Sequence, residues 1–333
     1  MTEKQSKWDA DLSLAGGHMP VMLNETIALL NVRADHMYID VTAGSGGHFK
    51  SICQKAGSSK NIIAFDQDIE AIERLRKSLG QEHADVKLIH SNFVHLKSEL
   101  AKLNINTING GILADLGVSS NQLDEAERGF SFLREGPLDM RMDIRSPISA
   151  YDLVNDLDES ELASIIYQYG EERHSRMIAR AIVRHRPIKT TLELANIIEN
   201  ATRSKRISNS KRHKNASKLH PATRTFQALR IAVNSELDNL KHFLEQSIDL
   251  LAPGARLVVI TFHSLEDRIV KQFFKEMASN CICPPRQPIC TCKQRAKVQI
   301  ITPKPLVALE EEILANIRSR SAKLRAVEKL PLG

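Results

Sequence analysis

The chain has 333 residues, of which 42% are hydrophobic and 26% are charged, a balance typical of a soluble globular protein. No run approaches the roughly 18 uninterrupted apolar residues that span a bilayer, and the first residues lack the basic-then-apolar pattern of a signal peptide. We therefore expect a cytoplasmic protein without a membrane partner. The formal net charge of +6 permits an anionic partner but does not by itself identify nucleic acid.

The first part of the chain alternates short apolar segments with amphipathic ones. Strands are expected at 37–41, 61–65, 86–90 and 111–114, and residues 69–79 repeat apolar positions at helical spacing. Alternation of this kind specifies a parallel sheet covered by helices on both sides. The expected fold class is therefore α/β, with a doubly wound, Rossmann-like sheet.

The alternation stops after Asp115. Residues 121–219 carry helix signals at 159–169, 173–185 and 192–201 and no convincing strand, and the strand pattern resumes at 256–262, with a closing segment near Val298. We expect a sheet domain interrupted by a helical insertion. The expected boundaries are a flexible tail at 1–17, a discontinuous sheet domain at 18–122 and 220–333, and an inserted helical domain at 123–219.

A glycine-rich loop, DVTAGSGGH at 40–48, follows the first strand and opens a helix. Its small residues let the backbone approach a ligand at the carboxyl edge of the sheet, although a tight turn alone would also explain them. A dinucleotide-binding fingerprint that began at Gly44 would need a small residue where Phe49 stands. Asp40, at the strand end, suits the cationic amino-acid part of S-adenosylmethionine, which is the cofactor we predict.

The next three strands end at residues that suit the rest of this cofactor. Asp66 can accept both ribose hydroxyls, or it can cap the following helix, a role that Asp68 could fill instead. Phe93 is placed where the adenine ring would lie, and it can equally belong to the core. Asp115 is placed at the reactive end of the cofactor.

Motifs spread over most of residues 18–325 carry a far more specific signal. They are HMPVM at 18–22, DVTAGSGGH at 40–48, DLGVSS at 115–120 with QLD at 122–124, RGFSF at 128–132, PLDMRMD at 137–143, YGEER at 169–173, HPATRTFQ at 220–227 and FHSLEDR at 262–268. With these blocks in this order, the chain resembles the bacterial methyltransferase family that modifies the exocyclic N4 amine of a cytidine in small-subunit (16S) ribosomal RNA.

The resemblance implies a class I methyltransferase fold with an inserted helical domain for RNA recognition. It implies direct methyl transfer from S-adenosylmethionine to 16S rRNA within the small ribosomal subunit, and it leaves the oligomeric state open, with a homodimer as one alternative. The cofactor contacts that it implies are Gly46, Gly47, His48, Asp66, Phe93, Asp115 and Gln122. The chain departs from the family pattern at Ser91-Asn92, where a glycine is frequent, and this bears on the backbone beside Phe93.

Two residues are candidates for catalysis. Cytosine's amine is a poor nucleophile because its lone pair is delocalised into the ring, and Asp115 is the best placed hydrogen-bond acceptor to localise that lone pair. His263 could relay the released proton or be a structural histidine. Phe130 or Phe132 could cover the face of an unstacked base, and both can instead be core residues.

Other classes of protein fit less well. A nicotinamide oxidoreductase would also use Asp66 but conflicts with Phe49 and with the motifs of 115–143, and an RNA-binding module would not need a cofactor edge. A carbon-5 pyrimidine methyltransferase needs a cysteine nucleophile beside the base, whereas Cys53 follows the glycine loop and the other cysteines are remote in sequence.

Two further clusters have more than one interpretation. Cys281, Cys283, Cys290 and Cys292 could offer four thiolates to zinc, but the C-x-C spacing is uncommon and four reduced, partly buried cysteines are the favoured interpretation. The run 203–218 has seven Lys or Arg and no acidic residue, which favours a mobile loop that contacts RNA phosphates or, alternatively, a solvated linker. A second basic run at 318–325 could extend the RNA surface.

Overall fold

The computed structural model describes residues 20–79, 86–212, 220–281, 283, 287, 291–292 and 294–331, without the side chains of 204–212. The chain divides into two compact units. The sheet unit is Met1–Gly117 with Leu237–Gly333, and the helical unit is Val118–Glu236.

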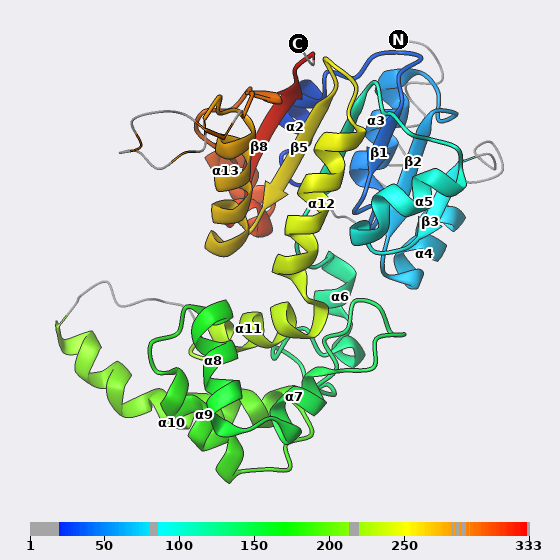
Figure 1. Cartoon of the computed structure of the whole chain (residues 1–333). Coiled ribbons are helices and arrows are strands. Elements are labelled where there is room, and N and C mark those ends of the chain that lie inside the picture. Colours follow the sequence, from blue (N-terminus) through cyan, green and yellow to red (C-terminus); the bar gives the residue numbers. More distant parts are fainter. Residues whose placement is uncertain are drawn as a thin grey trace. The chain divides into compact units, whose positions relative to one another are not determined.

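The sheet unit is built on a mixed sheet with the strand order β3-β2-β1-β4-β5-β8-β6, in which β7 also pairs with β8 (Figure 1). The strands are β1 Tyr38–Asp40, β2 Ile62–Asp66, β3 Lys87–His90, β4 Gly111–Asp115, β5 Arg256–Thr261, β6 Val298–Ile300, β7 Leu306–Val307 and β8 Lys323–Lys329. β1 to β5 pair in parallel with one another, and β8 is antiparallel to β5, β6 and β7.

Helices cover both faces of this sheet because successive strand residues point to opposite sides. Along β2, Ile63 and Phe65 enter the core cluster that also contains apolar residues of α5 (Leu96–Lys102), α12 (Glu236–Leu250) and α13 (Ser264–Met277). Ile62 and Ala64 enter the cluster shared with α2 (Leu23–Leu30), α3 (Gly47–Ala56) and α4 (Ile69–Leu79). In Figure 1, α12 and α13 lie on the near side of the strands and α2 lies behind them. The doubly wound α/β fold is therefore confirmed.

The second basic run, 318–325, is only partly exposed. Residues 317–321 form a 3-10 helix and 323–329 form β8, and Arg325 is buried in the sheet. Asp267 on α13 lies 2.7 Å from Nε of Arg325 and 3.0 Å from Nζ of Lys323. Arg325 is therefore engaged inside the sheet unit and unavailable to RNA, whereas Arg320 is exposed and Lys323 is 40% exposed, so an RNA contact by the rest of the run stays a prediction.

The helical unit has its own apolar core. Its helices are α6 Ser120–Asp124, α7 Ala150–Asp156, α8 Glu159–Gly170, α9 Ser175–Arg184, α10 Thr191–Arg212 and α11 Thr223–Asn234. Leu162 and Ile166 of α8 pack in one cluster with Phe226 and Leu229 of α11. Helix α11 thus belongs to the helical unit, which extends to Glu236 and not to residue 219 as the sequence suggested.

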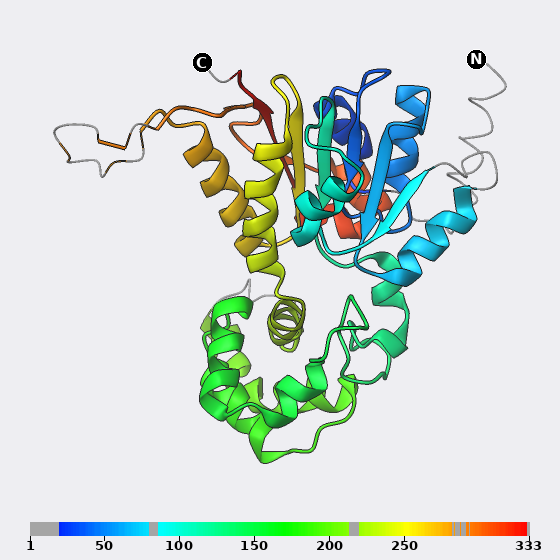
Figure 2. The same ribbon diagram turned by 45° about the vertical axis from the view of Figure 1, so that its right-hand side comes forward.

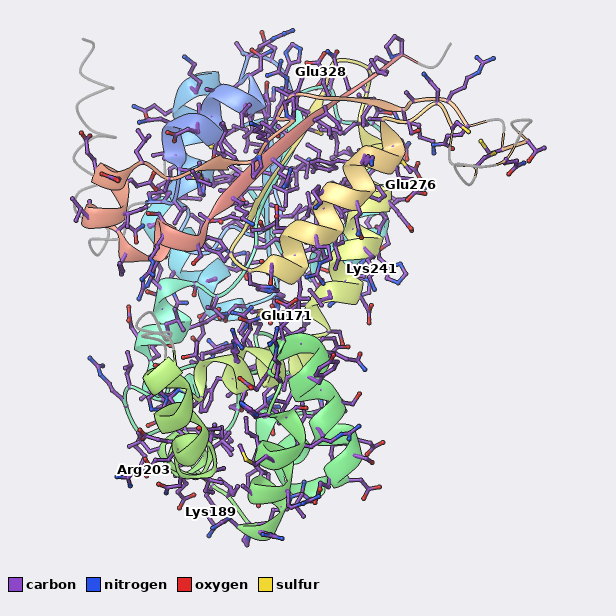
Figure 3. The ribbon with its side chains drawn as sticks, turned by 90° about the vertical axis from the view of Figure 1, so that its left-hand side faces the viewer. Glu171, Lys189, Arg203, Lys241, Glu276 and Glu328 are labelled. Atoms are coloured by element: carbon purple, nitrogen blue, oxygen red, sulfur yellow. The ribbon has the colours of Figure 1, made fainter. Side chains whose placement is uncertain are left out.

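The basic run 203–218 is also partly corrected. Helix α10 continues to Arg212, so the first ten residues of the run are helical and not a loop. Figure 3 labels Arg203 on this helix. The remaining residues of the run lie outside the described residues. Within the described part of the chain, no helix has the length and apolar character that crossing a membrane requires.

Candidate cofactor and active site

The acidic residues predicted for the site end neighbouring strands of the sheet. Asp40 ends β1, Asp66 ends β2 and Asp115 ends β4, and β1 pairs in parallel with both of the other strands. The carboxyl ends of parallel strands meet at one edge, which is where open α/β sheets bind ligands. The three strands β1, β2 and β4 run side by side (Figure 2).

The glycine loop that follows β1 needs glycine for two reasons. Gly44 and Gly46 have φ values of +51° and +82°, a conformation that L side chains rarely adopt. A Cβ at Gly46 would also collide with Cδ1 of Leu75 on α4, and a Cβ at Gly47 would collide with Pro20. The loop therefore lies close against neighbouring side chains as well as at the ligand edge.

Asp66 organises this loop. Its Oδ2 accepts a hydrogen bond from the backbone N–H of Gly44 at 2.7 Å, and its Oδ1 accepts one from Asp68 at 2.9 Å. Asp68 caps α4 by accepting from the N–H of Glu70 at 3.0 Å, so the helix cap is not the role of Asp66. Burial raises the pKa of Asp66 to about 6, and the two amide hydrogen bonds oppose that rise.

Asp40 keeps one oxygen without a partner. Its Oδ1 accepts from the backbone N–H of Thr42 at 3.1 Å, while Oδ2 is buried and has no hydrogen-bond partner among the described residues. Burial is the main reason that the pKa of Asp40 rises to about 7. Thr42 also joins β1 to β4, since its Oγ1 accepts from the backbone N–H of Asp115 at 2.6 Å.

Asp115 faces His48. Nε2 of His48 lies 3.0 Å from the carbonyl oxygen of Val21, which can only accept, so Nε2 carries the proton. Burial lowers the pKa of His48 to about 4, so the ring is neutral at physiological pH and Nδ1 presents a lone pair. Nδ1 lies 3.6 Å from Oδ2 of Asp115, while Oδ1 of Asp115 is buried and unpartnered among the described residues.

The pKa of Asp115 is raised well above its ordinary value, first by burial and then by the nearby charges of Asp40 and Glu266. Buried carboxylates with unpartnered oxygens are costly unless a cation or a donor meets them. The sulfonium and ammonium groups of S-adenosylmethionine would do so, whereas the anionic pyrophosphate of a dinucleotide would be repelled. These carboxylates therefore fit the predicted cofactor.

The other residues predicted for the site lie in different parts of the two units. Phe93 packs on Phe243 of α12 with ring centroids 5.1 Å apart, so its ring joins the edge of the core. Gln122 belongs to the helical unit, where Gln122 and Ser119 form the capping box of α6. The sheet unit thus brings together the acidic residues, the glycine loop and His48, and Gln122 is outside this set. In the helical unit Phe130 is buried, and Phe132 packs on His220 with centroids 4.7 Å apart.

His263 begins α13. Its Nε2 lies 3.1 Å from Oε1 of Glu266, whose Oε2 accepts from the backbone N–H of Phe262 at 2.8 Å. Sequence reasoning missed Glu266 and Thr42 as parts of this edge. The signal for Glu266 was present, because a glutamate three residues after a helix-capping position is typical of a capping box.

This strand order, with a glycine loop after β1 and an acidic edge, defines the fold and site of a class I S-adenosylmethionine-dependent methyltransferase. The model of the MraW methylase family matches residues 15–330, and the chain belongs to this family.

Two relatives are similar over nearly their whole length. A protein of Clostridioides difficile named ribosomal RNA small subunit methyltransferase H is 49% identical over 317 residues, which cover 94% of this chain and 99% of that relative. A protein of the same name from Brevibacillus brevis is 47% identical over 321 residues, with 96% and 99% coverage. Among solved structures, an rRNA methylase from Streptococcus thermophilus aligns with 92% of this chain and 95% of its own at 13% identity, with a TM-score of 0.39.

Proposed function

We propose that this methyltransferase transfers a methyl group directly to the exocyclic N4 amine of a specific cytidine in 16S ribosomal RNA. The family and the names of the similar proteins support rRNA as the substrate. The observation that carries the chemistry is the buried, unpartnered Oδ1 of Asp115 at the end of β4. It offers a hydrogen-bond acceptor at the place where a substrate amine would meet the cofactor.

The cofactor would be held by residues of the sheet unit. Asp66 would accept the ribose hydroxyls with the lone pairs that its two amide hydrogen bonds leave free. Asp40 would face the cationic amino-acid part of the cofactor. The backbone of the loop at Gly46, Gly47 and His48 would lie against the cofactor. Phe93 would flank its adenine ring. When bound, S-adenosylmethionine supplies an electrophilic methyl group.

Asp115 would act on the substrate amine. A hydrogen bond from the amine to Oδ1 would withdraw its lone pair from the ring and direct it at the electrophile. The cationic ligand would counteract the like-charge repulsion that raises the pKa of Asp115, and would favour the carboxylate needed for this step. The same carboxylate would then receive the proton that the methylated amine releases.

The state of Cys53, the cysteine that follows the glycine loop, argues against methylation of carbon 5 through a cysteine nucleophile. Cys53 is buried on α3, and burial raises the pKa of its thiol to about 12. A thiol of that acidity supplies almost no thiolate at neutral pH, so it would not serve as a nucleophile. Direct transfer needs no such group.

The proposal is tested by mapping methylated nucleosides in ribosomal RNA from cells that lack this protein. We expect one cytidine of 16S rRNA to lose its N4 methyl group and to regain it on complementation with the wild-type gene. An unchanged nucleoside map would contradict the proposal.

Supplying purified enzyme with naked 16S rRNA and with assembled small subunits then distinguishes the two substrates, of which we propose the assembled subunit. Sedimentation of the purified protein tests the homodimer, which stays a prediction.

A further inference from the structure

A cluster of thiols lies on the segment between α13 and β6, outside the methyltransferase site. The segment begins just after Glu276, which Figure 3 labels near the end of α13. The sulfur atoms of Cys281, Cys283 and Cys292 all lie within 4.8 Å of one another. They come from two C-x-C pairs whose remaining member, Cys290, lies outside the described residues.

The spacing of the sulfur atoms suits a metal better than a disulfide. Sγ of Cys292 lies 3.9 Å from Sγ of Cys281. A disulfide would bring two sulfurs to about 2.05 Å. Zinc–sulfur bonds of about 2.3 Å in a tetrahedron place two sulfurs about 3.8 Å apart. The observed separation therefore matches the edge of a tetrahedral thiolate site.

Backbone amides point at these sulfur atoms. The N–H of Cys283 donates to Sγ of Cys281 at 3.4 Å. The amides of Thr291 and Cys292 also donate to the sulfur of Cys283. Such donors stabilise thiolates, which are the form that binds metal. The local backbone is thus folded around sulfur acceptors.

Core packing does not explain the cluster. Cys281 is exposed, Cys283 and Cys292 are half-buried, and none of them belongs to a core cluster of the described residues. Unliganded cysteines are normally among the most buried residues. The sequence from Met277 to Leu309 contains no Asp or Glu and has Arg286, Lys293, Arg295, Lys297 and Lys304. This positive charge would offset the negative charge of a zinc–thiolate centre.

We propose that Cys281, Cys283 and Cys292 bind a zinc ion that fixes the segment between α13 and β6. The site is structural, since thiolates occupy the coordination positions and it uses none of the residues of the cofactor edge. A fourth ligand completes the tetrahedron, and the sequence makes Cys290 the first residue to test. The inference is independent of the proposed RNA substrate.

The test is metal analysis of the full-length protein purified with a reductant and without chelators. We expect elemental mass spectrometry to find one equivalent of zinc per chain. Cobalt replacing that zinc should give the visible absorption and sulfur-to-cobalt charge-transfer bands of tetrahedral thiolate coordination. A variant with Cys281→Ser and Cys292→Ser should lose the metal and both spectral features. Cys53→Ala, which removes the buried cysteine of α3, is the matched control and should keep a full equivalent.

Folding is checked separately by circular dichroism and by the affinity for S-adenosylmethionine, both of which should persist in the double variant. Cys290→Ser identifies the fourth ligand if it reduces the metal content. Zinc well below one equivalent in the wild-type protein, cobalt spectra typical of octahedral oxygen ligands, or a Cys281–Cys292 disulfide in the reduced preparation would each overturn the proposal.

Discussion

The three carboxylates at the edge of the sheet differ in how their oxygens are satisfied. Both oxygens of Asp66 accept backbone amides, whereas Asp40 and Asp115 each keep one buried oxygen without a partner among the described residues. An unpartnered buried oxygen is costly in the absence of a ligand and favourable when a cation or donor arrives. This difference suggests that Asp66 both supports the glycine loop and binds the cofactor, whereas Asp40 and Asp115 each need a ligand to supply a partner for the second oxygen.

Asp66→Ala should weaken S-adenosylmethionine binding by about 100-fold or more, because each lost hydrogen bond to a charged group is worth about 1.5 to 3 kcal/mol. It should also lower the stability of the unliganded protein, because the anchor of the Gly44 amide is lost. Calorimetry measures the affinity. Asp68→Ala is the matched control, because it removes the cap of α4 and leaves the carboxylate of Asp66 in place, and it should keep the affinity within a few-fold. Equal affinities in the Asp66 variant and the wild type would remove Asp66 from the site.

Asp115→Ala should slow single-turnover methylation at saturating cofactor and RNA, because no acceptor remains for the amine. Asp115→Asn keeps an acceptor oxygen and should retain more activity, since transfer depends mainly on positioning. Saturation hides a defect in binding and leaves a chemical defect visible. If the alanine variant reacts at the wild-type rate, Asp115 serves binding alone.

Cofactor binding should strengthen with rising pH. The pKa values of Asp40 and Asp66 are raised in the folded protein to about 7 and about 6, so between about pH 4 and 7 the folded state holds protons that the unfolded state has released. These carboxyls therefore contribute less stability as pH rises through that window. A cationic ligand favours their ionised forms, so S-adenosylmethionine should raise the unfolding temperature more at about pH 8 than at about pH 5.

Differential scanning at both pH values measures this effect. Asp40→Asn, which removes the group with the higher pKa, should reduce the difference between them. A ligand-induced shift that is the same at both pH values in the wild type would contradict the assignment of these carboxyls to the cofactor.

At the scale of single elements, the loop between β1 and α3 is held by contacts outside itself. Gly46 and Gly254 have nearly the same φ values, +82° and +83°. A Cβ at Gly254 would meet nothing within 4 Å, whereas one at Gly46 would collide with Leu75. The two positions therefore separate backbone strain from crowding.

Gly46→Ala should destabilise the protein by about 2 to 5 kcal/mol, because about 1 to 2 kcal/mol of left-handed strain adds to about 1 to 3 kcal/mol of overpacking. Gly254→Ala should cost the strain alone, about 1 to 2 kcal/mol. Urea denaturation gives both values. Equal losses would show that α4 yields to the new methyl group and that the loop is not tightly packed.

At the scale of the whole molecule, the helical unit carries the basic run on α10. This helix continues to Arg212, so the backbone of Lys211 and Arg212 is helical and not a loop. Contacts between such side chains and phosphates release counterions, which makes binding depend on salt. The sheet unit, by contrast, engages Lys323 and Arg325 with Asp267.

Replacing Lys211 and Arg212 with alanine should weaken RNA binding and flatten its dependence on salt, by about 0.7 to 0.9 in the slope for each phosphate that is no longer neutralised. The control pair is Lys102→Ala with Lys241→Ala, which removes the same charge from exposed positions of α5 and α12. Its slope should stay at the wild-type value. Fluorescence anisotropy with an rRNA fragment over a series of salt concentrations distinguishes the two pairs, and identical slopes would mean that α10 does not touch RNA.

The sequence was sufficient for features that depend on neighbouring residues. Apolar periodicity located β1 to β5 to within about two residues, and parallel topology then required Asp40, Asp66 and Asp115 to share an edge. The motifs identified the family over nearly the whole chain. Periodicity and motifs are local properties, which is why they can be seen before the chain is folded.

Only the tertiary structure decided the features that depend on distant partners. β8 pairs antiparallel between β5 and β6, and this pairing buries Arg325 against Asp267, 58 residues away in the chain. Helix α11 joins α8 in the helical unit because their apolar faces fit together, although its sequence follows the expected boundary. The raised pKa of Asp115 results from burial and from like charges on other strands and helices. No local pattern encodes these effects, since burial and long-range electrostatics exist only once the elements have packed.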